Sequence, residues 1–149
     1  DINDRFYLVR SGADRQLPGS ALPPKVNVAS RLITSTQVLA LNSTPIEVVA
    51  AAPVGWVHIP IRGLVEFEGG SVDYATNTEL IVGSTSSLSL LLLGSIADRT
   101  YPNALTIVSG AGGSPAEAGD SLSAYVNGGD PTAGDSDIRV TVWYYTLEL

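Results

Sequence analysis

Side chains able to do chemistry are few in this sequence. None of its 149 residues is cysteine and one is histidine, His58, so thiol nucleophiles, thiolate metal sites and disulfides are excluded. A catalytic histidine needs an orienting carboxylate and a nucleophile within hydrogen-bond reach, and the sequence around His58 supplies neither. We therefore interpret His58 as a histidine on a strand surface or in an interface, where it could make a pH-sensitive contact.

Acidic residues cluster in one turn-rich segment and raise the question of calcium. Asp130, Asp135 and Asp137 lie in the run DPTAGDSD, and calcium favours clustered carboxylates and carbonyls. The run lacks the Asp-x-Asp-x-Asp-Gly pattern of an EF-hand and its distal glutamate. The simpler interpretation is a solvated hairpin loop in which Asp and Gly satisfy turn geometry, with calcium as the alternative.

Other catalytic patterns are missing or uninformative. The glycines of residues 110–113 and 128–129 do not lie between a strand and a helix, and no P-loop lysine accompanies them. Paired carboxylates of the glycosidase kind are defined by their spatial separation, and the candidates are more simply outward positions on half-exposed strands: Glu47, Glu66, Glu68, Asp73 and Glu79. We expect a protein that is not an enzyme and that has no catalytic residue, no metal and no cofactor.

Three consecutive aromatic residues give the clearest indication of a binding surface. Trp143, Tyr144 and Tyr145 lie in an alternating run, and successive side chains of a strand point to opposite faces. At least one large ring must therefore leave the core, to be covered by another element of the chain or by a partner. Trp and Tyr are enriched in protein interfaces, so Trp143, Tyr145 and the second tryptophan, Trp56, are candidate partner-binding residues.

The charge of the chain limits its partners. Charged residues make up 15% of the sequence, against roughly 25% in an ordinary domain, and such a neutral surface favours permanent assembly with other subunits. The net charge is −7 and the eight basic residues are scattered, which argues against binding to nucleic acid or to an anionic membrane. The apolar run at residues 88–93 is far shorter than a bilayer span of about 20 residues, and we expect a soluble chain.

The first 25 residues differ from the rest and predict an extended N-terminal arm. Phe6, Tyr7, Leu8 and Val9 form a short β-prone run, and residues 11–25 are rich in Gly, Pro and Ser, which favours an extended path over a folded element. An arm of this composition cannot bury its apolar residues locally. We expect it to lie on its own domain or on a neighbouring subunit, and these four residues are the first candidates for partner binding.

Residues 26–149 predict an antiparallel β-sandwich, with a jelly roll among the leading topologies. Pro60 indicates an edge strand or a bulge, and Thr34 with Gln37 resembles the capping box of a short helix within residues 34–41. Residues 86–93 are ambiguous between strand and helix. Residues 72–75 and 79–82 are expected to pair across 76–78. Strands are predicted at residues 26–29, 46–52, 55–68, 72–75, 79–82, 105–108, 121–126 and 137–149.

Several segments resemble small virion structural proteins of tailed bacteriophages. The longest is residues 33–53 (ITSTQVLALNSTPIEVVAAAP), in which a Leu-Asn-Ser-Thr-Pro turn precedes strands. Residues 74–77 (YATN) and 134–135 (GD), which lead to 142–145 (VWYY), are similar to later features of that type. The opening residues 4–12 (DRFYLVRSG) resemble a segment at the start of phage particle components. The resemblance covers most of the chain as a loose pattern.

This resemblance implies a non-enzymatic virion protein, assembled in the host cytoplasm. In one reading it is a capsid decoration (cement) protein, a homotrimer of jelly rolls whose arm staples neighbouring copies of the major capsid protein. In another, the arm anchors the chain to tail, baseplate or fibre proteins, and the loops at 76–78, 110–119 and 127–136 face a host receptor. A carbohydrate-binding sandwich is the third reading. The few aromatic anchors in these loops favour the first.

Overall fold

The computed structural model describes residues 7–10, 13–16, 24–84, 90–97, 103–104 and 118–149. Nearly all regular structure in these residues is β, with one helix of four residues. No helix in them is long and apolar enough to cross a membrane. The elements are β1 (Tyr7–Arg10), β2 (Ala13–Gln16), β3 (Asn27–Ile33), α1 (Ser35–Val38), β4 (Ile46–Val49), β5 (Trp56–Glu68), β6 (Glu79–Gly83), β7 (Leu90–Ser95), β8 (Asn103–Ala104), β9 (Leu122–Val126) and β10 (Asp137–Glu148).

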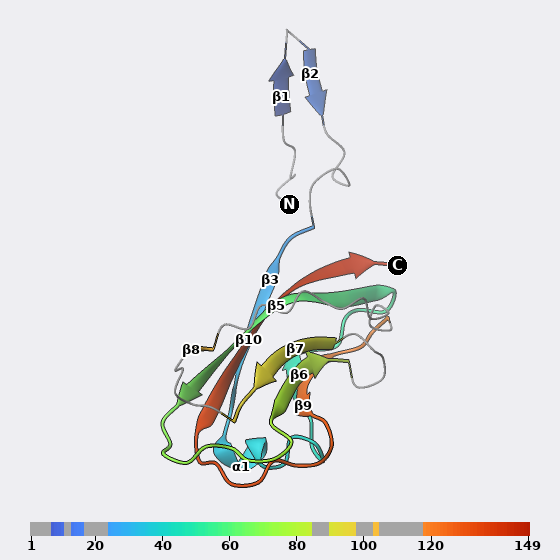
Figure 1. Ribbon diagram of the computed structural model, residues 1–149. Coiled ribbons are helices and arrows are strands. Elements are labelled where there is room, and N and C mark those ends of the chain that lie inside the picture. The colour runs from blue at the N-terminus through green and yellow to red at the C-terminus, as the bar shows by residue number, and fades with distance from the viewer. Residues whose placement is uncertain (1–6, 11–12, 17–23, 85–89, 98–102, 105–117) are drawn as a thin grey trace.

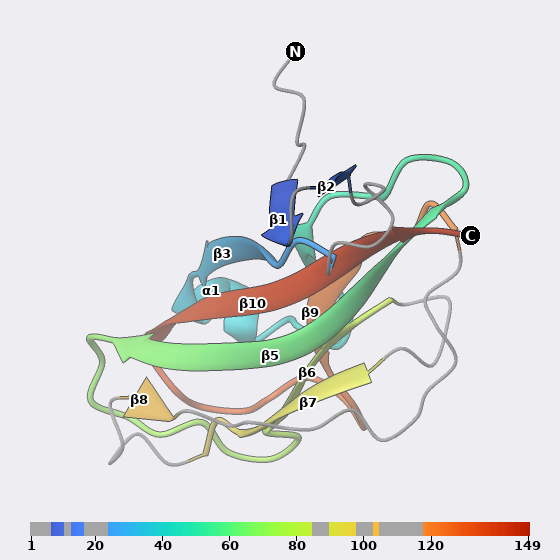
Figure 2. The same cartoon turned by 90° about the horizontal axis from the view of Figure 1, so that it is seen from above.

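The body of the chain is an antiparallel sandwich of two four-stranded sheets, ordered β3-β10-β5-β8 and β4-β9-β6-β7. Its strand pairs are nested: β3 pairs with β10, β4 with β9, β5 with β8 and β6 with β7. This is the arrangement of one long hairpin rolled into two layers, which defines a jelly roll. Figures 1 and 2 show the two layers from the side and from above. The predicted all-β sandwich and its jelly-roll topology are confirmed.

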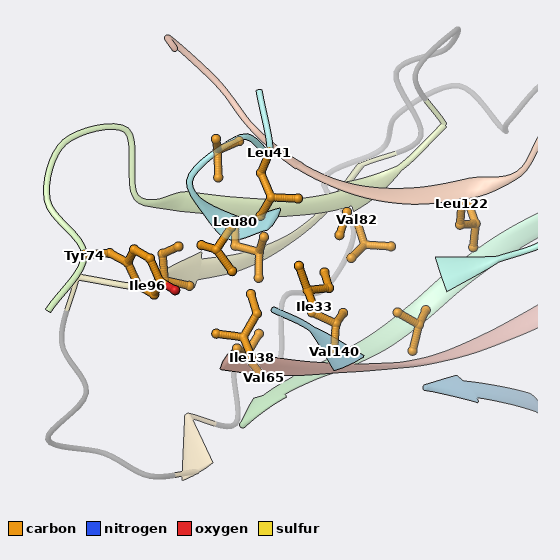
Figure 3. Close-up of a cluster of buried hydrophobic side chains, with 14 of the residues drawn as sticks. Ile33, Leu41, Val65, Tyr74, Leu80, Val82, Ile96, Leu122, Ile138 and Val140 are labelled. Atoms are coloured by element: carbon orange, nitrogen blue, oxygen red, sulfur yellow. The ribbon is translucent and has the colours of Figure 1, made fainter. Parts of the chain in front are cut away.

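The core lies between the layers and is built from alternate residues of the long strands. Ile138, Val140 and Val142 of β10 are fully buried, as are Leu80 and Val82 of β6. Figure 3 shows side chains of both sheets meeting in this cluster, with Leu41 from the segment after α1. Period-two alternation places these residues inward, and the same alternation sends the intervening residues of β10 outward.

A bulge in β5 changes which residues of that strand face the core. The register against β10 shifts between Trp143 and Tyr144, so Arg62 pairs with Trp143 while Pro60 pairs with Tyr144. Ile61 is thus the extra residue, and the inward positions are odd-numbered after it and even-numbered before it. The bulge predicted from Pro60 is confirmed. A continuous alternation over residues 56–62 would place His58 and Arg62 on one face, whereas the bulge places them on opposite faces.

The structure confirms the predicted helix cap and contradicts the predicted pairing of residues 72–75. The Thr34–Gln37 capping box is present at α1, and the ambiguous run contributes a strand, β7. Residues 72–75 do not pair with 79–82: Ala75 forms one isolated bridge with Thr132, and β6 pairs with β7 and β9. The predicted strand at 105–108 lies outside the described residues.

The N-terminal segment contains a hairpin. β1 and β2 pair antiparallel, with Leu8 opposite Arg15 and Val9 opposite Asp14. Residues 13–16 are therefore a strand, contrary to the prediction of an unpaired extended path over 11–25, because β1 offers them a ladder of backbone partners. Figure 1 draws this hairpin beyond the sandwich, at the end where β3 begins and the C-terminus lies.

Candidate functional site

The aromatic run of β10 is divided between the two faces of its sheet, as the alternation requires. Tyr144 packs against the core and meets the ring of His58 edge-on, with centroids 4.9 Å apart. Trp143 and Tyr145 point to the opposite, outer side and are half-buried. The guanidinium carbon of Arg62 lies 4.9 Å from the centroid of the Trp143 ring, a cation–π distance.

These rings belong to a larger surface, which we call the outer face: the outward side of β3, β10 and β5. Val28 lies opposite Trp143 and Leu32 opposite Arg139, and opposite residues of an antiparallel pair share a face. The two aliphatic side chains remain 56% and 38% exposed. Apolar side chains are thus exposed to solvent on the same face as the aromatic rings. The outer face comprises Val28, Ser30, Leu32, Arg62, Leu64, Glu66, Arg139, Thr141, Trp143 and Tyr145.

Charges on and beside this surface are balanced locally. Nε of Arg139 donates to a carboxylate oxygen of Glu68 at 2.6 Å. Both side chains are about two-fifths exposed, and a pair exposed to this degree contributes little to stability. Because Glu68 pairs with Arg139, the charge of this arginine is balanced on the surface offered to a partner.

The seven predicted partner-binding residues do not form one cluster. Trp143 and Tyr145 share the outer face, whereas Trp56 is half-buried at the start of β5 and pairs with Glu148. Tyr7, Leu8 and Val9 lie in β1, and Phe6 lies outside the described residues. The sequence gives no sign of Arg62 and Val28 beside Trp143 or of Leu32 beside Arg139, because these positions follow from the register of three strands and not from any local motif.

His58 is not at a surface, and that interpretation is wrong. It precedes the bulge, so it faces inward, and it is 6% exposed. Its Nε2 lies 3.0 Å from the carbonyl oxygen of Ala50 and its Nδ1 lies 3.0 Å from Oγ1 of Thr146. Without the bulge, the alternation of β5 would place His58 on the same face as Arg62. The sequence pattern therefore predicted the wrong face for His58.

The partners of His58 define its tautomer when the ring is neutral. A carbonyl oxygen can only accept, so Nε2 carries a hydrogen and donates to Ala50, and in the neutral ring Nδ1 then accepts from the Thr146 hydroxyl. Oγ1 of Thr146 in turn accepts from Nδ2 of Asn27 at 3.3 Å. Burial lowers the pKa of His58 below its ordinary value, with the Ala50 hydrogen bond acting in the opposite direction. The fold therefore disfavours the charged form of the ring.

The three aspartates of the predicted calcium loop each bind backbone amides of another segment. Asp130 accepts from the amides of Asn42 and Ser43 at 2.8 and 2.9 Å. Asp135 accepts from the amides of Ser71 and Val72 at 2.6 and 2.8 Å. Asp137 accepts from the amide of Ser35, at the start of α1, at 2.8 Å. Their geometry is that of connectors between loops, and in the described part of the chain no three His, Cys, Asp or Glu residues are grouped to hold a metal.

One of these carboxylates has a perturbed acidity. The backbone amide and the side chain of Ser43 hold the pKa of Asp130 below its ordinary value; burial acts in the opposite direction, and the amide of Asn42 adds a lesser lowering effect. A lowered pKa keeps the carboxylate ionised, which strengthens its hydrogen bonds to the loop after α1.

These contacts close the end of the sandwich remote from the arm, which we call the loop end: residues 39–45, 69–78 and 127–136. Ala75 and Thr132 exchange two backbone hydrogen bonds of 2.7 Å, and Nδ2 of Asn77 donates to the carbonyl of Asp130 at 3.3 Å. Buried Tyr74 donates its hydroxyl hydrogen to the carbonyl of Ser136. Figure 1 shows the loop end opposite the hairpin.

Comparisons with known proteins add one distant likeness. No family model matches the sequence, and no curated protein matches it. Among solved structures, a chain of the cyanophage Pam1 capsid asymmetric unit is similar over 93% of this chain and 96% of that chain, at 20% identity and a TM-score of 0.42. A likeness this distant carries no inference about function, which is argued below from the residues and their geometry.

Proposed function

We propose that this chain is a non-enzymatic structural protein of a tailed-phage virion, and specifically a decoration protein that binds the capsid lattice through its N-terminal hairpin. The observation that carries the proposal is the hairpin itself. In the described residues β1 and β2 pair with each other and with no third strand. An isolated two-stranded hairpin is marginally stable in water and needs a further strand or an apolar surface. An element of this kind beyond the sandwich fits a segment that becomes ordered against a neighbouring protein.

The outer face supports a role in assembly. Exposed Val28 opposite Trp143 and Leu32 opposite Arg139 provide apolar area, and Glu68 pairs with the charge of Arg139. Copies that each carry a net charge of −7 repel one another, so they would meet most favourably through neutral surface. We include in the proposal a homotrimer that uses this face.

The loop end favours decoration over host attachment. Residues 76–78 and 127–136 are bonded to each other through the side chains of Thr76 and Asn77. The carboxylate of Asp130 is engaged by the amides of Asn42 and Ser43. A receptor-binding tip needs exposed anchoring side chains, typically Trp, Tyr or Arg, and residues 127–136 contain none of these. A tail or fibre role remains the alternative reading of the same hairpin.

The experiment compares the intact chain with variants of the hairpin on phage particles that lack the chain. Light scattering should give three times the 15.5 kDa chain mass, and the trimer should bind heads and raise their resistance to heat or chelators. Deletion of residues 1–24 should abolish binding. Val9→Asp should do the same, because Val9 lies opposite Asp14 and like charges directly opposite destabilise a strand pair.

The matched control is Val54→Asp, the same change at an apolar residue that is 97% exposed on the sandwich, which should bind normally. Unchanged attachment and particle stability after the deletion would refute the proposal. Binding to tails or host cells without binding to heads would establish the attachment reading instead. Retention on immobilised polysaccharide, abolished by Trp143→Ala, would favour the carbohydrate-binding reading, since Trp143 and Tyr145 lie on one face.

A further inference from the structure

We propose that His58, Thr146 and Asn27 form an acid-sensitive latch that holds the base of the N-terminal arm to the sandwich. The inference goes beyond the proposed function and does not depend on it, because it concerns the isolated chain. Three side chains far apart in the sequence are joined in one line of hydrogen bonds, Asn27–Thr146–His58–Ala50. Because this line joins the start of β3 to β10 and β5, it can hold the base of the arm in place.

The latch lies where the arm leaves the body. Asn27 is the first residue of β3, and its partner Tyr144 is the last residue of β10 that β3 pairs with. From Tyr145 to Glu148, β10 is paired with β5. The hydrogen bond from Nδ2 of Asn27 to Oγ1 of Thr146 therefore reaches past the end of the β3–β10 ladder and fastens the start of β3 to this extension.

The hydrogen-bond directions allow one arrangement when the ring is neutral. His58 donates from Nε2 to Ala50, Thr146 donates its hydroxyl hydrogen to Nδ1, and Asn27 donates to Thr146. Every donor has an acceptor. A proton taken from solvent by Nδ1 turns that nitrogen into a donor, so the Thr146 oxygen accepts from both the ring and Asn27, and its hydroxyl hydrogen loses the Nδ1 acceptor. The charged ring is then 6% exposed, and no carboxylate of the described residues is bonded to it.

Among the described residues, no charged group on the packed elements is bonded to the ring, whose hydrogen bonds go to Thr146 and Ala50. On β10 the ring meets Tyr144, and the next acidic residue along that strand, Glu148, is exposed. The connection 50–55, which supplies the Ala50 carbonyl, contains no ionisable residue. On β4, Glu47 is exposed and pairs with Ser123 on the outward side of its sheet. Lys25, before β3, is exposed and would oppose a second positive charge.

Acid should therefore open the latch before it unfolds the chain. The folded state disfavours protonated His58, whereas an opened base lets the ring take its ordinary acidity. Opening is consequently unfavourable above the ordinary histidine pKa of about 6.5 and becomes easier as pH falls from there toward the lower folded value. Carboxylates with ordinary acidity, near 4, remain ionised over the upper part of this range.

Two measurements on the purified full-length chain test the latch. His58 is the single histidine, so its ring signals in an NMR titration are unambiguous and should titrate below pH 6.5. Amide hydrogen exchange, corrected for intrinsic rates, should show residues 26–29 and 145–148 losing protection between pH 7.5 and 5, while residues 138–142 keep theirs. We expect a loss of about fivefold, the equilibrium factor of one net hydrogen bond.

Two variants separate the latch from general acid sensitivity. His58→Gln keeps a neutral donor and removes the titration, so the loss of protection on acidification should disappear. Thr146→Val removes the hydroxyl and should lower protection of residues 26–29 at both pH values. Its matched control is Thr141→Val on the same strand, which removes the exposed hydroxyl contact with Ser30 at 3.0 Å and should leave residues 26–29 unchanged at neutral pH.

Three results would overturn the proposal. One is a protonated His58 with undiminished protection of residues 26–29. Another is a pH dependence that survives in His58→Gln. The third is a ring that does not titrate above pH 4 while the chain is folded. None of these results bears on whether the hairpin binds capsids, so the two proposals can fail separately.

Discussion

Single residues at the loop end are positioned by close contacts that admit few substitutions. Gly134 has φ +93°, a conformation that side chains rarely adopt, and a Cβ there would lie 2.2 Å from a ring carbon of Tyr74. The Tyr74 hydroxyl in turn donates to the Ser136 carbonyl inside the buried end of the core. A glycine and a tyrosine 60 residues apart are thus one packing unit.

Gly134→Ala should therefore destabilise the chain strongly. Both the left-handed backbone and the collision with a buried ring oppose the added methyl group, and we expect a loss of roughly 2–4 kcal/mol in the free energy of unfolding. Urea denaturation followed by fluorescence measures it. Gly69→Ala is the matched control, since Gly69 has φ +70° but nothing within 4 Å of its Cβ position. Equal losses in the two variants would show that strain alone, and not the Tyr74 ring, determines the cost.

Tyr74 should also lower the stability of the chain at alkaline pH, and substitution of this residue should reduce that pH dependence. Burial, with the negative charges of Asp137 and Asp135, raises the pKa of Tyr74 to about 12, against an ordinary value near 10. The unfolded chain releases this proton first, so stability is complete below pH 10 and declines as pH rises toward 12. Tyr74→Phe should be less stable at pH 7 by roughly 1 kcal/mol through the lost hydrogen bond, yet decline less between pH 10 and 12. A parallel decline in both proteins, measured by urea denaturation, would contradict the assignment.

At the scale of elements, the sequence predicted what local chemistry determines. The capping box of Thr34 and Gln37 and the alternation of β10 are local patterns, and both were recognised. Pro60 indicated the bulge in β5 but not its consequence, because the face that each half of the strand presents depends on the register against β10. The inward position of His58 and the contact of Arg62 with Trp143 both follow from that register, which no local pattern contains.

The capping box gives the element-scale prediction. In Thr34→Ala the backbone amide of Gln37 loses its acceptor on the side chain, and α1 carries fully buried Val38 into the core. We expect a loss of about 1 kcal/mol in the free energy of unfolding. Thr36→Ala, an exposed position inside α1, should be neutral or slightly stabilising because alanine has the higher helix propensity. Thermal denaturation of both variants measures the difference, and equal effects would show that the cap is not needed.

At the scale of the whole molecule, the two ends of the sandwich differ in structure, and the outer face forms a third distinct surface. The loop end is closed by hydrogen bonds, the opposite end carries the hairpin and the latch, and the outer face presents apolar and aromatic side chains. The sequence predicts an arm over residues 1–25 and a body from residue 26, and β3 begins at Asn27. The sequence did not locate the outer face, since exposed residues of β3 carry no signal of their own until the strand is placed at a sheet edge.

The outer face supplies the last prediction, which concerns self-association. Val28→Asp places a carboxylate in the apolar area beside Trp143, where burial against a second copy would leave the charge unpaired at a cost of several kcal/mol. The variant should keep its thermal stability, because Val28 is 56% exposed in the single chain, but light scattering should show monomers where we expect the parent chain to form the proposed trimer. Val54→Asp adds the same charge to the same residue type away from the outer face and should remain a trimer. If both variants stay trimeric, the copies meet elsewhere, and the hairpin would be the next surface to test, through the mass of the chain that lacks residues 1–24.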